Sequence, residues 1–249
     1  MTGVQTCALP ILVAAKTSGS FVLAVAAGGA AAVLLGYLSD RFLIRRAGEN
    51  HLAQVLITVG LAYVIGDISI KVWGGDALKL PLPMALRGVV ELPGGMIYPV
   101  YRLLLVAIGL AVALLLWLIY RRTQVGAAIR AGVDDKEMVG AMGIHVDRLF
   151  VMVSALASFL AGCSGVLGGA FLTVYPGAEW EILVFALVVV IVGGLGSLEG
   201  AMLGALIVGL LDAYGRWLVP EMSYFVLFGP MAVLLLFRPR GLFGSAQMH

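Results

Sequence analysis

Charged residues are scarce in this chain. Asp, Glu, Lys and Arg make up 12% of its 249 residues, whereas a typical soluble domain contains about 25%. Hydrophobic residues account for 61%, and the mean hydropathy is +1.06. The sequence also lacks the short alternating segments that mark a transmembrane barrel. This composition predicts an all-α polytopic membrane protein.

The motifs of several function classes are missing as well. The two cysteines, Cys7 and Cys163, give no disulfide framework. No His, Cys, Asp and Glu residues have metal-ligand spacing, so no metal site is predicted. There is no GxSxG nucleophile motif, no Walker loop and no basic stripe of the kind that binds nucleic acid. We therefore expect no bound cofactor, no nucleic-acid partner and no ATP hydrolysis by this chain itself.

Long uncharged runs recur along the sequence, and about 20 helical residues suffice to cross a hydrocarbon core. We predict about seven spans in this chain. They are residues 20–39, 52–70, 99–120, 149–170, 182–198, 200–219 and 223–237. The fifth and sixth are short and meet at the sequence GGLGSLEG. They are either two spans or one helix broken inside the membrane.

Arginines gather in alternate loops, which predicts the orientation of the chain. Residues 40–51, residues 121–148 and the C-terminal tail fall on one side if the spans alternate, and we expect that side to be cytoplasmic. Residues 171–181 and the proline-rich loop 71–98 fall on the other, external side. The contrast is incomplete because the external loop also contains Lys71, Lys79 and Arg87.

The first residues suggest a separate expectation. The start of the chain, residues 1–11, has no basic region typical of a signal peptide. It resembles translated sequencing-adapter read-through. We expect that this segment is not native and that at least one more span precedes the chain, which would give eight or more in the full-length protein.

Residues 121–148 form a charged loop that is too long and too patterned to be a simple connector. Asp134 is predicted to cap a helix over 134–142, with Glu137 reaching back to it as in a capping box. Gly143 supplies the C-terminal stop, because a left-handed backbone is easiest for glycine.

The apolar face of this short helix is formed by Met138, Ala141 and Met142, at positions i, i+3 and i+4. A helix of this length is marginal alone in water, so its apolar face needs a surface to pack on. That surface is either the chain's own membrane domain or a soluble partner.

The chain resembles the permease subunits of branched-chain amino acid ABC importers, and it looks closer to the first of the two permease types in that system. The resemblance covers roughly residues 20–244. It is carried by residues 58–75, 129–148, 188–214 and 234–244, with GGLGS and RPRGLFG as the more specific motifs. The loop pattern of ABC permeases is Glu-Ala-Ala, three residues, then Gly. Glu137 and Gly143 match it, whereas Met138 and Val139 replace the two alanines.

This resemblance implies one permease domain over residues 1–249, with 121–148 as the cytoplasmic coupling loop and 71–98 as an external loop. It implies import of branched-chain amino acids or similar small amides across a bacterial or archaeal inner membrane. The implied partners are a sister permease, two ATPase subunits that use ATP and Mg, an external substrate-binding protein and membrane lipid. The implied ATPase-coupling residues are Asp134, Glu137, Met138, Ala141, Met142 and Gly143.

Two glycine clusters leave alternatives open. Gly193, Gly194 and Gly196, followed by Ser197, form either a tight turn or a broken helix beside the translocation pathway, where half-helix ends can bind carboxylates. The glycines of the fourth span favour close helix packing over pore lining. They are Gly162, Gly165, Gly168 and Gly169.

Other function classes remain as alternatives. A secondary transporter or channel would work without an ATPase, but ion coupling usually needs intramembrane acids. Asp67 is the one acid within the second span, and it lies near the outer end close to Lys71. A membrane enzyme lacks support because no polar cluster converges. An ABC permease for sugar or urea also remains open.

Overall fold

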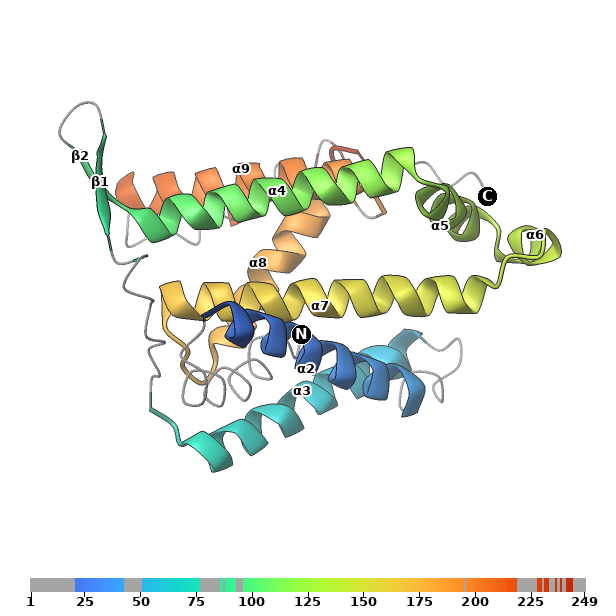
Figure 1. Ribbon diagram of the computed structural model, residues 1–249, viewed down its shortest axis with the longest axis horizontal. Coiled ribbons are helices and arrows are strands. Elements are labelled where there is room, and N and C mark those ends of the chain that lie inside the picture. Colours follow the sequence, from blue (N-terminus) through green and yellow to red (C-terminus); the bar gives the residue numbers. More distant parts are fainter. Residues whose placement is uncertain are drawn as a thin grey trace. The chain divides into compact units, whose positions relative to one another are not determined.

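The computed structural model is mainly helical. It describes residues 21–42, 51–76, 86, 88–92, 96–194, 196–218, 228–229, 231–232, 236, 238 and 241–243. The chain divides into two compact units, Met1–Glu179 and Trp180–His249. The elements are α2 (Phe21–Phe42), α3 (His51–Trp73), β1 (Val89–Leu92), β2 (Met96–Pro99), α4 (Val100–Arg122), α5 (Gln124–Asp134), α6 (Lys136–Ala141), α7 (Val146–Leu172), α8 (Ala178–Gly193) and α9 (Leu198–Leu218) (Figure 1).

Among the described residues, 5 helices are long and apolar enough to cross a membrane, namely α2, α3, α4, α7 and α9. Each overlaps a predicted span. α8 has 16 residues, fewer than the roughly 20 that cross a hydrocarbon core. The predicted span 223–237 lies largely outside the described residues. The all-α membrane fold class is therefore confirmed, whereas the number of seven spans stays a prediction.

α2 and α7 form the main helix pair of the first unit. Gly36, near the end of α2, lies against Ser158, and a Cβ atom on the earlier Gly29 would lie 2.6 Å from the ring of Phe159 and 2.9 Å from the sulfur of Cys163. Later residues of α2 meet earlier residues of α7, so the two helices are antiparallel. The end of α2 therefore lies toward the beginning of α7.

Small residues on α7 allow this close approach. A Cβ atom on Gly162 would lie 2.6 Å from the carbonyl oxygen of Gly28 and 2.7 Å from the Cβ of Ala32. The predicted packing role is confirmed for Gly162. It does not extend to Gly168, where a Cβ would meet nothing within 4 Å.

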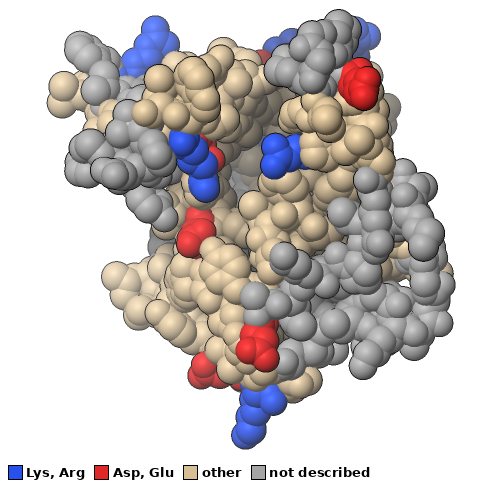
Figure 2. Space-filling model, turned by 90° about the vertical axis from the view of Figure 1, so that its left-hand side faces the viewer, with Lys and Arg blue, Asp and Glu red and all other residues tan. Residues whose placement is uncertain are grey.

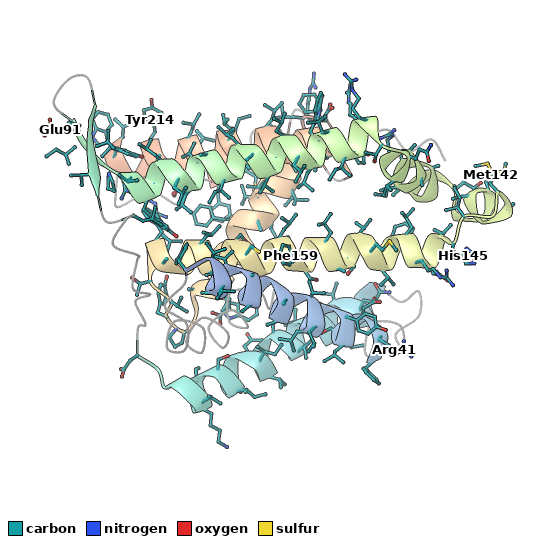
Figure 3. The ribbon with its side chains drawn as sticks, in the orientation of Figure 1. Arg41, Glu91, Met142, His145, Phe159 and Tyr214 are labelled. Atoms are coloured by element: carbon teal, nitrogen blue, oxygen red, sulfur yellow. The ribbon has the colours of Figure 1, made fainter. Side chains whose placement is uncertain are left out.

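α4 is joined to α7 at the other end of this bundle. The hydroxyl of Tyr101, at the start of α4, donates a 2.7 Å hydrogen bond to the carbonyl of Leu167, near the end of α7. Arg41, Met142 and His145 lie at one end of the first unit and Glu91 at the opposite end (Figure 3). This is the relative placement that alternating spans require. Which end is cytoplasmic stays a prediction.

The predicted external loop 71–98 contains a strand pair that the all-α prediction did not include. β1 and β2 are antiparallel, with Val89 opposite Pro99 and Glu91 opposite Ile97. A two-stranded hairpin is marginal alone, but β2 continues directly into α4. On the face drawn in Figure 2, acidic and basic side chains are scattered among uncharged ones, and neither sign dominates the described surface.

Candidate functional site

The charged loop contains two helices rather than the one predicted. The helix missed by sequence reasoning is α5, which begins after Thr123. The Thr123 side chain accepts a 3.2 Å hydrogen bond from the backbone N–H of Gly126, which is N-cap geometry. The signal for α5 was present in this threonine and in the helical spacing of Val125, Ile129 and Gly132. Its small residues give α5 a low overall hydrophobicity, so it does not stand out as the long apolar runs do.

α6 is shorter than predicted, and a different aspartate caps it. Asp134 is the last residue of α5, so it cannot take the non-helical backbone of an N-cap. The Asp135 side chain accepts a 3.0 Å hydrogen bond from the backbone N–H of Met138 and caps α6 instead. The prediction of Asp134 as the cap is therefore wrong by one residue. The side chains of Asp134 and Glu137 lie outside the described part of the chain, so the capping-box contact of Glu137 stays a prediction.

Gly143 ends α6 as predicted. Its φ of 84° is left-handed. The N–H of Ile144 donates to the carbonyl of Val139 at 3.4 Å, and that of Gly143 to Gly140 at 3.0 Å. These two bonds form a Schellman motif, in which a left-handed residue satisfies the last carbonyls of a helix.

The two faces of α6 differ in exposure. The Val139 side chain is 2% exposed, whereas Met138 and Met142 are 62% and 66% exposed. Ala141 is exposed too, and Met142 lies at the outer end of the loop (Figure 3). α6 therefore packs on its own domain through Val139, and its methionine face remains open on the described chain.

The glycine segment between α8 and α9 forms a turn, as in the first of its two predicted alternatives, and its place beside the translocation pathway stays a prediction. α8 ends at Gly193, earlier than the predicted 198, because Gly194 and Gly196 adopt left-handed φ values of 100° and 84°. Ser197 then accepts a 3.0 Å hydrogen bond from the N–H of Gly200 and caps the start of α9. The two helices are thus separate.

Glycines also bring α8 and α9 into close contact. A Cβ atom on Gly193 would meet the carbonyl of Gly200 and lie 2.7 Å from the backbone nitrogen of Ala201. One on Gly204 would lie 2.7 Å from the carbonyl oxygen of Val189. This reversed order of contacts makes α8 and α9 an antiparallel hairpin. Its buried core consists of Val188, Val192 and Val208.

The C-terminal tail meets the end of α8. The backbone N–H groups of Leu242 and Phe243 donate hydrogen bonds of 3.0 and 3.1 Å to the carbonyls of Val192 and Gly193. Leu242 also packs against the buried valine core. The carbonyls in the last turn of a helix lack hydrogen-bond partners within that helix. The tail therefore supplies donors for two of these carbonyls at the end of α8.

The remaining candidates form no polar centre. Asp67 is exposed on α3. Asp212 pairs with Arg216 at 2.9 Å, one helical turn away on α9. Among the residues that the structure describes, no three His, Cys, Asp or Glu side chains gather in a group that could hold a metal ion.

Comparison with known proteins identifies a family and several relatives. The chain matches the family described as branched-chain amino acid transport system / permease component over residues 3–235. It is 26% identical over 248 residues to the high-affinity branched-chain amino acid transport system permease protein BraD of Pseudomonas aeruginosa, covering 97% of this chain and 78% of that protein. No solved structure shows a significant match.

Two further relatives match smaller parts. The permease protein LivH of Escherichia coli is 31% identical over 138 residues, which are 55% of this chain and 45% of that protein. The probable LivH of Methanocaldococcus jannaschii is 25% identical over 191 residues, which are 74% of this chain and 59% of that protein. The family match begins inside residues 1–11, whose non-native origin stays a prediction. The family match and the span-length helices together show that the chain belongs to the permease components of branched-chain amino acid transport systems, which are multi-pass inner-membrane transport subunits and not enzymes.

Proposed function

We propose that this chain is one of two permease subunits of an ATP-driven importer for branched-chain amino acids or similar small amides. An external binding protein delivers the substrate, and two ATPase subunits drive the alternation between outward-open and inward-open states. ATP and Mg belong to those ATPase subunits. In this proposal, α6 lies at the cytoplasmic end of the first unit. The C-terminus is cytoplasmic as well.

The observation that carries this proposal is the geometry of α6. This helix lies in the connection between two span-length helices, α4 and α7. Val139 anchors one face, and Met138 and Met142 expose more than half of their side chains on the other. Methionine is flexible and suits surfaces that must fit a moving partner. A soluble ATPase that holds this face can push or pull both connected spans.

The proposed substrate class is supported by the names of BraD and LivH, which specify branched-chain amino acids. The apolar side chains of such substrates need no charged pocket, in agreement with the scarcity of charge in the spans. We also propose that Gly193, Gly194, Gly196 and Ser197 lie beside the pathway.

The test is reconstitution of the full-length permease with its sister permease, both ATPase subunits and the binding protein in proteoliposomes. We expect uptake of radiolabelled leucine that needs ATP on the ATPase side and is not reduced by excess ribose or urea. Met142→Asp should release the ATPase on co-purification and abolish uptake, whereas Met142→Leu should preserve both. Uptake that persists without ATPase subunits would identify a secondary transporter, and uptake of ribose or urea instead of leucine would reassign the substrate.

A further inference from the structure

Two carbonyl groups at the end of α4 are bonded by residues beyond the helix. The last carbonyls of a helix lack partners within it. The hydroxyl of Thr123 donates a 2.6 Å hydrogen bond to the carbonyl of Ile119. Arg130, on the next helix, donates through Nη1 to the carbonyl of Tyr120. A cation at this position is also favoured by the helix dipole.

Arg130 makes a second contact with the same residue. Its guanidinium carbon lies 5.0 Å from the centre of the Tyr120 ring, within the range of a cation–π interaction. Arginine suits both contacts, because its planar group can donate hydrogen bonds at the edge and stack through its face. Tyr120 is therefore held at its backbone and at its ring by one side chain.

α5 approaches α4 at a second point on the same face. Gly126 is one helical turn before Arg130, so the two residues lie above one another on α5. A Cβ atom on Gly126 would collide with the carbonyl oxygen of Tyr120 and lie 2.6 Å from that of Ile119. The absence of a side chain at Gly126 leaves room for the carbonyl that Arg130 binds.

α5 is in turn continuous with α6. The N–H of Asp135 donates to the carbonyl of Ala131 at 2.9 Å, and Asp135 then caps α6 through the N–H of Met138. Gly132 lies beside α7, where an added Cβ would be 3.6 Å from Val146 and 3.8 Å from Phe150. A displacement of α6 would therefore reach α5, and α5 is joined to α4 both through Thr123 and through Arg130.

We infer that Arg130 is a positioning residue that fastens the α5–α6 pair to α4 and transmits movement of the methionine face to that membrane span. The inference rests on the proposed function, because it needs an ATPase that moves α6. In this inference Arg130 acts on Tyr120 of α4 and not on the ATPase or the substrate. A variant that lacks the Arg130 side chain should therefore keep its ATPase bound and hydrolyse ATP, but transport little leucine.

The experiment compares the parent importer with Arg130→Met, Arg130→Lys and the matched control Arg122→Met. Arg122 also lies at the end of α4, is exposed, and makes no such contact within the described residues. Three quantities are measured on each assembled complex: ATPase retention on co-purification, leucine moved per ATP hydrolysed, and amide hydrogen exchange of residues 124–134. The Arg130→Met complex should retain the ATPase but move about tenfold less leucine per ATP, because a charge-assisted hydrogen bond between α5 and α4 is lost. For the same reason, amide hydrogen exchange of residues 124–134 should become faster. Arg130→Lys should recover part of both effects, and Arg122→Met should match the parent.

The possible failures are distinguishable. Unchanged leucine per ATP in Arg130→Met overturns the transmission role, as does release of the ATPase by that variant, since Arg130 would then shape the docking surface. Unchanged exchange in residues 124–134 overturns the fastening contact itself. If the parent complex retains no ATPase, the proposed function fails and the transmission role fails with it, while the exchange data still decide whether Arg130 holds α5 on α4.

Discussion

Gly241 lies directly against Gly194: a Cβ atom on Gly241 would be 2.5 Å from the Cα of Gly194 and 2.7 Å from the carbonyl oxygen of Ile191. The next two residues bond the carbonyls of Val192 and Gly193. Gly193 and Gly194 of the GGLGS motif and residues 241–243 of the RPRGLFG motif, which lie far apart in the sequence, therefore pack together. The tail caps α8 and holds the turn to α9.

Gly241→Ala should destabilise the protein more than Gly196→Ala. Both glycines have left-handed φ values, 78° and 84°, and an alanine there costs about 1–2 kcal/mol. An added Cβ at Gly196 meets nothing within 4 Å, whereas at Gly241 it meets the backbone, which adds about 1–3 kcal/mol of overpacking. Thermal unfolding in detergent measures the difference. Equal melting temperatures for the two variants would mean that the tail does not dock on α8.

Ser197→Ala should lower stability by about 1 kcal/mol, the usual loss for removing an N-cap side chain. The Ser197 hydroxyl is the acceptor for the N–H of Gly200. Ser197→Thr keeps an acceptor oxygen and serves as the control. Denaturant unfolding of both variants tests this expectation. If Ser197→Ala were as stable as the parent and Ser197→Thr were destabilised, the Ser197 side chain would not cap α9.

Gly162→Ala should weaken the α2–α7 pair, because the new methyl group would lie 2.6 Å from the Gly28 carbonyl oxygen. The expected loss is about 1–3 kcal/mol. Gly168→Ala is the matched control on the same helix, since a Cβ there meets nothing within 4 Å. Melting temperatures in detergent should fall for the first variant and hold for the second. The reverse order would rule out the close glycine contact.

Gly143→Ala should loosen the end of α6. The φ of 84° at Gly143 makes a left-handed alanine unfavourable by about 1 kcal/mol, which corresponds to roughly fivefold faster amide exchange in this helix. Gly140 is the matched control, because an added Cβ there also meets nothing within 4 Å. Gly140 lies within α6, so Gly140→Ala should slow amide exchange, because alanine favours the helix more than glycine does. Exchange of residues 138–142 tests both expectations, and parental exchange in Gly143→Ala would contradict the Schellman end.

The long helices could be predicted from the sequence because each needs only an uncharged run of sufficient length. The end of α6 was also predictable, because few residues other than glycine tolerate the backbone at Gly143. Asp134 and Asp135 could not be separated by the same reasoning, since either can cap a helix. The extension of α5 through Asp134 decided in favour of Asp135.

The contacts between distant segments were not predictable. Nothing local at Arg130 indicates that its partner is the carbonyl of Tyr120. Likewise, the motif around Gly241 identifies a family resemblance but not its position against Gly194. Both are tertiary contacts with backbone atoms, and backbone acceptors have no residue-type signature. The side chain that faces inward on α6, Val139, was also missed because the predicted apolar face was assigned to the methionines.

The central claim is that the exposed methionine face of α6 contacts an ATPase, and site-specific photo-cross-linking tests it most directly. Benzoylphenylalanine would be placed at Met142 on α6 or at Met152 on the span α7, two methionines with matched exposures of 66% and 67%. In a complex that transports leucine, the account predicts an ATPase adduct from position 142 and none from position 152. Transport-competent complexes that give no ATPase adduct from position 142 would contradict it.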